Sequence, residues 1–241
     1  MRVFITTCSR NKAPGGFPYD RYYWHWRKRA EILERRYEIL GLLHDGTLKT
    51  KKEPPKEGLD FFVDAMDGLY LPAVERYGAG SFVGGLSEAK PNMVSWPMRN
   101  RIYFLSALYG LVHYREPIQD YDLLKDRRLQ KIWERSPVIT DALINELDVY
   151  RNDCRIIDCT VNPDYRELVD WKRLRKEGFT VWHVVPKGRT KERRARWLSG
   201  FLAGDADAHP ELFEKGGRFG SISLRTELPA QYFPRHERSA R

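Results

Sequence analysis

The chain has 241 residues, of which 41% are hydrophobic and 31% charged, so it is too apolar for a disordered protein and long enough to bury a sizeable core. No apolar run reaches the roughly 20 residues that a membrane-spanning helix needs, and residues 1–12 lack a signal-peptide pattern, so we expect a cytoplasmic protein with no membrane partner. A formal net charge of +9 favours a polyanionic partner, and we expect DNA or a nucleotide.

The first half of the chain predicts one strand and two helices. Residues 2–7 (RVFITT) are a β-rich run typical of a buried strand. Over residues 20–43, apolar side chains recur at helical spacing between arginines that include Arg35 and Arg36, which predicts a long amphipathic helix with one basic face. Residues 49–58, rich in lysine and proline, indicate an exposed connection before a shorter helix over 59–66.

The second half predicts strands that alternate with helices. Residues 101–107, 154–161 and 179–185 are β-rich runs. Helices are expected over residues 162–176 and 190–202, because each segment begins with capping residues and continues at helical spacing.

This order favours an α/β fold: a single domain with a mostly parallel central sheet flanked by helices. We expect the domain to span residues 1–204, and residues 205–241 to form a C-terminal extension that packs on it or trails from it. The three cysteines, Cys8, Cys154 and Cys159, are an odd set without metal-type spacing, so we expect reduced thiols, no metal site and no cofactor.

A polar turn follows the first predicted strand and could cradle a phosphate. It contains Ser9, Arg10, Asn11 and Lys12, and a turn at the carboxyl edge of a parallel sheet offers backbone N–H groups and a cation to an anion. The glycine pattern of a P-loop is absent, and an ordinary capped turn is the alternative.

A second polar group follows the strand predicted at residues 101–107. Ser106, Tyr109, Gln119 and Tyr121 could read the edge of a nucleobase or stack on its face. The alternative is a structural turn, in which Gly110 supplies an unusual backbone angle and the tyrosines pack in the core.

Carboxylates at the end of the next strand are the candidate catalytic residues. Asp158 or Asp164 could position water for hydrolysis at a sugar carbon, with Asn162 and Tyr165 nearby. The structural alternative is that Asn162 and Asp164 cap a helix and that Asp158 pairs with a lysine or arginine.

Basic clusters are the candidate contacts to a nucleic-acid backbone, and a solvated helix face is the alternative. The candidate residues are Arg27, Lys28, Arg35, Lys187, Arg189, Lys191, Arg193, Arg194 and Arg196. His113 and His183 lack metal-type spacing, and isolated histidines are usually structural.

Residues 105–112 (LSALYGLV), followed by residues 117–121 (PIQDY), resemble the LSxLYGLL…QPY signature of the peroxide-stress YaaA family. Residues 7–12, 67–70, 162–165 and 191–197 resemble that family in the same order. The chain departs from the pattern where TCSRNK replaces SPAKT and where Asp120 replaces the proline of QPY, so it resembles a divergent member.

The resemblance implies a cytoplasmic α/β protein linked to DNA binding and to the protection of DNA during peroxide stress. We therefore expect a DNA-binding protein that engages a base or nucleotide in a strand-end pocket. One alternative is a nucleobase-processing enzyme, such as an N-glycosidase on modified or damaged bases, and a second is a regulatory protein that binds a small nucleotide.

Overall fold

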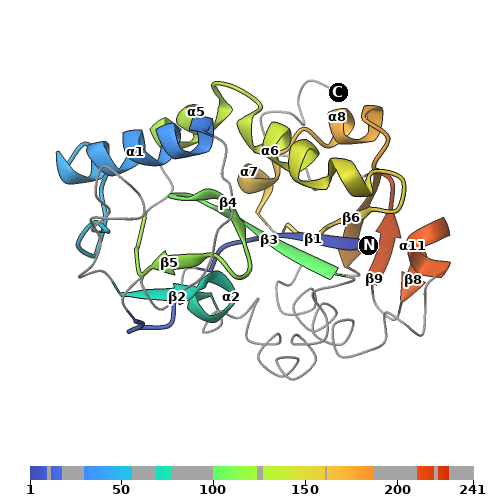
Figure 1. Cartoon of the computed structure of the whole chain (residues 1–241), viewed down its shortest axis with the longest axis horizontal. Helices are drawn as coiled ribbons and strands as arrows, with labels where there is room; N and C mark the ends of the chain where they lie inside the picture. The colour runs from blue at the N-terminus through green and yellow to red at the C-terminus, as the bar shows by residue number, and fades with distance from the viewer. Residues whose placement is uncertain are drawn as a thin grey trace.

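The computed structural model describes residues 1–9, 12–17, 30–55, 69–77, 100–123, 127–160, 162–186, 211–219 and 222–227. Within these residues, seven strands form one sheet in the order β4-β3-β1-β6-β7-β9-β8 (Figure 1). The strands are β1 (Arg2–Thr7), β3 (Asn100–Ser106), β4 (Gly110–His113), β6 (Arg155–Asp158), β7 (Thr180–Pro186), β8 (Gly217–Phe219) and β9 (Ile222–Arg225).

The centre of the sheet is parallel and its edges are antiparallel. β1 pairs in parallel with β3 and β6, and β6 pairs in parallel with β7, whereas β4 and β9 run antiparallel to their neighbours β3 and β7. The apolar and β-branched residues of β1 suit a central strand, and residues 3–7 are all buried. The α/β class with a mostly parallel core is therefore confirmed in outline.

The strand order creates a topological switch point. The chain leaves β1 to form β3 on one side, then returns past β1 to form β6 on the other side. In open α/β sheets the connections diverge at such a point, and the crevice outside the carboxyl ends of the strands is where ligands bind.

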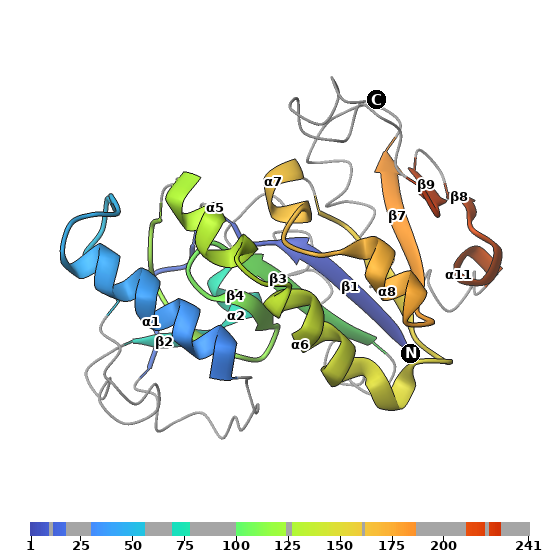
Figure 2. The ribbon, with the colours of Figure 1, turned by 90° about the horizontal axis from the view of Figure 1, so that it is seen from above.

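Helices cover one face of the sheet, and a small ribbon lies against the other (Figures 1 and 2). The covering helices are α1 (Ala30–His44), α5 (Arg127–Glu134), α6 (Val138–Leu147) and α8 (Trp171–Lys176). Below the sheet in Figure 1 lie α2 (Ala73–Arg76) and the antiparallel pair of β2 (Tyr70–Pro72) with β5 (Pro117–Gln119). No helix in the described part of the chain is long and apolar enough to cross a membrane.

The basic face predicted for the first helix is incomplete. In α1 the buried positions are Ile32, Arg36, Ile39, Leu40 and Leu43, so Arg36 points into the core. Its guanidinium pairs with Glu116 at 2.9 Å and donates to the carbonyls of Tyr109 at 2.7 Å and Leu111 at 3.1 Å. The side chain therefore stabilises the turn between β3 and β4, because it satisfies the buried carbonyls of that turn.

The helix predicted over residues 162–176 is two helices, α7 (Pro163–Arg166) and α8. The break occurs because Asp170 starts a new helix: its carboxylate accepts from the backbone N–H of Arg173 at 2.9 Å. Asn162 caps α7 in the same way and accepts from the N–H of Asp164 at 3.1 Å.

The C-terminal segment extends the sheet. α11 (Glu211–Lys215) precedes β8 and β9, and β9 pairs with β7 from His183↔Arg225 to Pro186↔Ile222. The indole N–H of Trp182 donates to the carbonyl of Phe213 at 2.7 Å. The described part of the predicted extension is thus an integral edge of the fold. The helices expected over residues 59–66 and 190–202 lie outside the described residues.

Candidate functional site

Polar residues from three parallel strands converge at the switch point. Cys8 and Ser9 follow β1, Ser106 ends β3, and Asp158 ends β6. The ladder continues past the end of β1, because the N–H of Cys8 donates to the carbonyl of Leu105 at 2.9 Å. These residues therefore occupy the edge of the sheet at which α/β folds place their ligands.

A buried hydroxyl cluster lies behind this edge. The Ser106 hydroxyl is 2.7 Å from the Tyr121 hydroxyl, which in turn is 3.0 Å from the Tyr77 hydroxyl. Ser106 also accepts from the N–H of Tyr109 at 3.0 Å. Burial, reinforced by the neighbouring Cys8, raises the pKa of Tyr77 and Tyr121 well above its ordinary value, so both phenols remain protonated donors at neutral pH.

Lys12 brings a cation to this cluster. Its ammonium lies 4.0 Å from the centre of the Tyr121 ring, a distance at which the face of the ring attracts a cation. Burial lowers the pKa of Lys12, whereas Cys8, Asp122 and Asp120 oppose that shift. Of the predicted phosphate turn, the structure describes Ser9, which is buried, and Lys12, whereas Arg10 and Asn11 lie outside the described residues.

Cys8 is a residue of this site that the sequence placed in the turn after the first strand, as a reduced thiol, without identifying it as a candidate site residue. Its sulfur lies 3.8 Å from the hydroxyl of Tyr165, and the residue is half-buried, whereas Cys154 and Cys159 are buried. Burial raises the pKa of Cys154 to about 11. The position of Cys8 directly after the central strand was the signal that could have identified it.

Tyr109 and Gln119, predicted to read a base, are tied into the fold. The Tyr109 hydroxyl accepts from the backbone N–H of Gln119 at 3.2 Å, and the Gln119 amide donates to the Tyr70 hydroxyl at 2.9 Å. These bonds join the β3–β4 turn to the β2–β5 ribbon. Ser106 and Tyr121 are buried as well. The four residues predicted to read a base therefore fit the alternative of a structural turn with tyrosines packed in the core, and they form a rigid wall behind the strand ends.

Asp158 is fully buried and enclosed by donors. Its carboxylate binds Arg166 at 2.8 Å and His183 at 2.7 Å, and it accepts from the N–H of Thr160 at 2.7 Å. Burial alone would raise its pKa, but Arg166 and His183 hold the pKa of this carboxyl well below its usual range. This geometry matches the structural alternative, in which Asp158 pairs with an arginine.

The histidine beside Asp158 is held in one tautomer. His183 Nε2 lies 2.8 Å from the guanidinium of Arg175, which can only donate. Nε2 must therefore accept, and Nδ1 carries the hydrogen that is donated to Asp158. The Asp158–His183 pair holds the carboxyl end of β6 to the neighbouring strand β7.

An apolar hollow opens beside the hydroxyl cluster. It is open to solvent, comprises about 280 Å³ of empty space when that solvent is included, and is lined by Ala107, Leu129, Gln130, Trp133, Asp164, Tyr165 and Leu168. Two predicted site residues, Asp164 and Tyr165, thus line the hollow. Because the Tyr165 hydroxyl also contacts Cys8, the tyrosine links the hollow to the end of β1.

Trp133 forms one wall of the hollow, and nothing in the sequence reasoning anticipated it. Its indole N–H donates to the carbonyl of Ala107 at 2.8 Å, which fixes α5 against the end of β3. The ring fits only because residue 110 is glycine: an added Cβ would lie 2.5 Å from the ring. Gly110 also has φ of +67°, a conformation that glycine adopts without strain.

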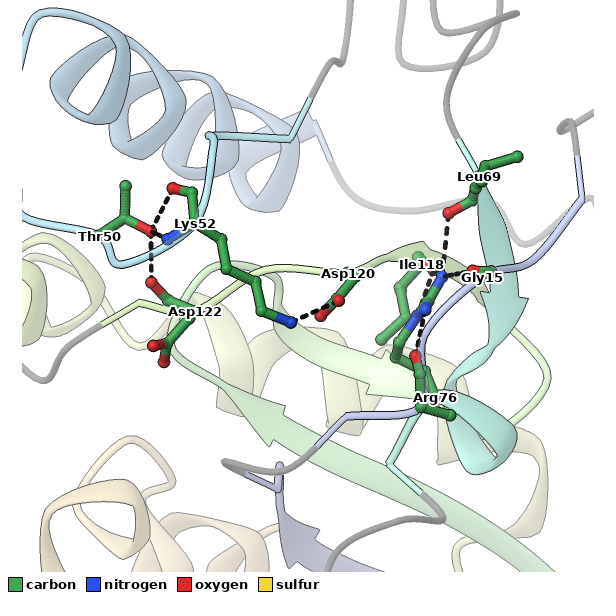
Figure 3. Close-up of polar contacts among 9 residues, drawn as sticks. Gly15, Thr50, Lys52, Leu69, Arg76, Ile118, Asp120 and Asp122 are labelled. Carbon is green, nitrogen blue, oxygen red and sulfur yellow. Dashed lines mark hydrogen bonds and ion pairs between the residues drawn. The ribbon is translucent and has the colours of Figure 1, made fainter.

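A buried arginine fixes the turn that carries Lys12 (Figure 3). Arg76 of α2 is fully buried and donates to the carbonyls of Ala13, Gly15 and Leu69, the last two at 3.0 Å and 2.9 Å. It also donates to the carbonyl of Ile118 in β5. Two contacts join residues 50–52 to the segment after β5: Lys52 pairs with Asp120 at 2.5 Å, and Thr50 donates to the carbonyl of Asp122 at 2.5 Å (Figure 3).

Most of the predicted backbone-contacting residues lie outside the described part of the chain: Arg27, Lys28, Lys187, Arg189, Lys191, Arg193, Arg194 and Arg196. Arg35 is described, and it lies on α1 at 3.8 Å from Glu38. Among the residues that the structure describes, no group of three histidine, cysteine or acidic side chains is arranged to hold a metal ion.

A scan against protein-family models finds no family that matches the chain, and a search of curated proteins finds no similar sequence.

Proposed function

We propose that this chain is a DNA-binding protein of the YaaA-like type, which accommodates a base or nucleotide at the carboxyl ends of β1, β3 and β6 and acts in DNA protection or the stress response. The observation that carries the proposal is the convergence at the switch point. There Lys12, the thiol of Cys8 and a set of buried hydroxyls lie beside an apolar hollow that Tyr165 connects to them.

The parts of this site suit the parts of a nucleotide. A flat base can pack one face on an apolar and aromatic surface such as the one that Trp133 and Tyr165 line. The ammonium of Lys12 supplies the positive charge that a phosphate requires. Its turn is fixed by Arg76, so little conformational entropy is lost when a ligand binds.

The net charge favours a long polyanion over a small nucleotide. At +9 the protein attracts a phosphate backbone from a distance and releases counterions when it docks. A small nucleotide would need only the cation at the strand ends. A long polyanion and a small nucleotide differ in the number of phosphates that the protein contacts, and the salt dependence of binding measures that number.

Fluorescence anisotropy with labelled duplex and single-stranded DNA over a salt series tests the proposal. Affinity should fall as salt rises, with a slope of about 0.9 per phosphate neutralised on duplex DNA. Lys12→Gln should weaken binding and reduce that slope by about 1. Lys215→Gln is the matched control, since it removes the same charge from an exposed position on α11, next to the edge strand β8. Absent or salt-independent binding would refute the proposal.

A second candidate function, a nucleobase-processing enzyme such as an N-glycosidase, is favoured by one observation: Asp164 lines the hollow. A carboxylate there could assist water at the sugar carbon of a bound nucleotide. The test is incubation with normal, oxidised and modified DNA, followed by detection of released bases or abasic sites. If release occurs and Asp164→Asn leaves its rate unchanged, Asp164 does not have this role.

A further inference from the structure

Residues 49–52, which we call the basic strip, lie against the segment that follows β5. Three of them are exposed lysines: Lys49, Lys51 and Lys52. The fourth, Thr50, is half-buried, forms an antiparallel bridge with Leu123 and donates to the carbonyl of Asp122 at 2.5 Å (Figure 3). Adjacent side chains of an extended segment point to opposite sides, so a threonine turned toward the protein leaves the lysines before and after it turned toward solvent.

Two further contacts hold the basic strip in place. The ammonium of Lys52 pairs with Asp120 at 2.5 Å, and the backbone N–H of Lys52 donates to the Thr50 hydroxyl at 3.2 Å. The backbone that carries the lysines is therefore fixed before any ligand arrives. A surface that is already ordered loses little conformational entropy when a partner binds to it.

The basic strip lies close to the cation at the strand ends. The ammonium of Lys12 is 4.0 Å from the centre of the Tyr121 ring. In the chain, Tyr121 lies between Asp120 and Asp122, the two residues to which the strip is bonded. Burial lowers the pKa of Lys12, and the positive charge of Lys52 adds to that shift. Lys12 and the strip thus contribute to one region of positive potential.

Two lysines of the basic strip keep their charge available to a ligand. Lys52 is paired with Asp120, but no carboxylate in the described part of the chain pairs with Lys49 or Lys51. A solvated face is the usual explanation of a run of lysines. Here the run is fixed beside a further cation, where like charges repel one another and an anion placed among them removes that cost. A nucleic-acid backbone supplies such an anion at every phosphate.

We propose that the basic strip is a docking surface for the phosphodiester backbone of DNA, in which Lys49 and Lys51 contact phosphates next to the one bound at Lys12. Lys52 holds the strip in place through Asp120. This inference rests on the proposed DNA-binding function and specifies where the backbone lies. The sequence reasoning had treated residues 49–58 only as an exposed connection.

Fluorescence anisotropy with labelled duplex DNA over a salt series tests the docking surface. The double variant Lys49→Gln/Lys51→Gln should bind more weakly, and the slope of log affinity against log salt should decrease by about 2, since each lost phosphate contact removes about 1. Lys172→Gln/Lys176→Gln is the matched control. It removes the same charge from exposed positions on α8, which lies at the opposite end of the helical layer from α1, the helix that precedes the strip (Figures 1 and 2). The control should leave the slope unchanged.

Circular dichroism establishes that each variant is folded. A slope that is unchanged in Lys49→Gln/Lys51→Gln, or that decreases equally in this variant and in the control, overturns the docking surface and leaves the DNA-binding proposal standing. If the unaltered protein binds neither duplex nor single-stranded DNA at any salt concentration, both proposals fall.

Discussion

Replacement of Gly110 by alanine tests how closely the β3–β4 turn and Trp133 depend on each other. Gly110 has φ of +67°, and a Cβ added there would lie 2.5 Å from two carbons of the Trp133 ring. The ring cannot simply move away, because its indole N–H is bonded to the carbonyl of Ala107 at 2.8 Å. The substitution therefore meets both a backbone and a steric penalty.

The magnitude follows from these two effects. A left-handed conformation costs a non-glycine residue about 1–2 kcal/mol. Overpacking in a filled core adds about 1–3 kcal/mol. We expect Gly110→Ala to lower the free energy of unfolding by about 2–5 kcal/mol, which is a large fraction of the total for a typical domain.

Two other glycines separate the contributions. Gly46 has φ of +76° with open space around it, so Gly46→Ala should lose only the backbone part, about 1–2 kcal/mol. Gly41 lies within α1, also with open space, so Gly41→Ala should gain about 0.5–1 kcal/mol from helix propensity. Urea unfolding of the three variants, with equal m-values, measures these differences. If Gly110→Ala loses no more than Gly46→Ala, the ring does not occupy the position described.

Two further predictions concern protonation and thiol chemistry. Burial lowers the pKa of His113 to about 3 in the folded protein, so on acidification the unfolded chain binds a proton at this histidine before the folded protein does. The free energy of unfolding should therefore be highest above about pH 6.5 and should fall by up to about 1.4 kcal/mol per pH unit toward pH 3. The pKa of Asp158 is lowered in the folded state, so this carboxyl adds a further decrease in the free energy of unfolding that begins below about pH 4. Urea unfolding midpoints measured from pH 4 to pH 8 check this prediction. The substitution His113→Gln should make the midpoint nearly independent of pH above pH 4. If the pH dependence is unaltered in that variant, it arises from another titratable group. Iodoacetamide should modify the native protein at Cys8 well before Cys154 and Cys159, since only Cys8 is partly exposed, and peptide mass spectrometry locates the label. Equal labelling of all three thiols would contradict this difference in burial.

The sequence predicted correctly those parts of the fold that are determined by a residue and its neighbours in the chain. The β-rich run of β1 gave its bounds, Asn162 identified the start of α7, and Gly110 marked the tight turn after β3. Each of these depends on a residue and its immediate neighbours. The prediction of one continuous helix over residues 162–176 was wrong, because Asp170 caps a second helix within that segment.

The site was less predictable because its partners are distant in the chain. Arg36 looked like part of a basic face, yet it pairs with Glu116 in the core. Arg76 fixes Gly15 across a separation of 61 residues, and no local pattern indicates that contact. The wall formed by Trp133 likewise depends on α5 packing against the end of β3, which only the assembled sheet determines.

The attachment of β9 to β7 has a consequence for how the chain can be shortened. A truncation near residue 204 would look reasonable from the sequence, because the segment after it is rich in glycine and charge. Such a truncation would leave β7 with an open row of N–H and C=O groups and would remove the carbonyl that Trp182 bonds. Exposed edges of this kind recruit strands from other molecules, so we expect the shortened protein to aggregate.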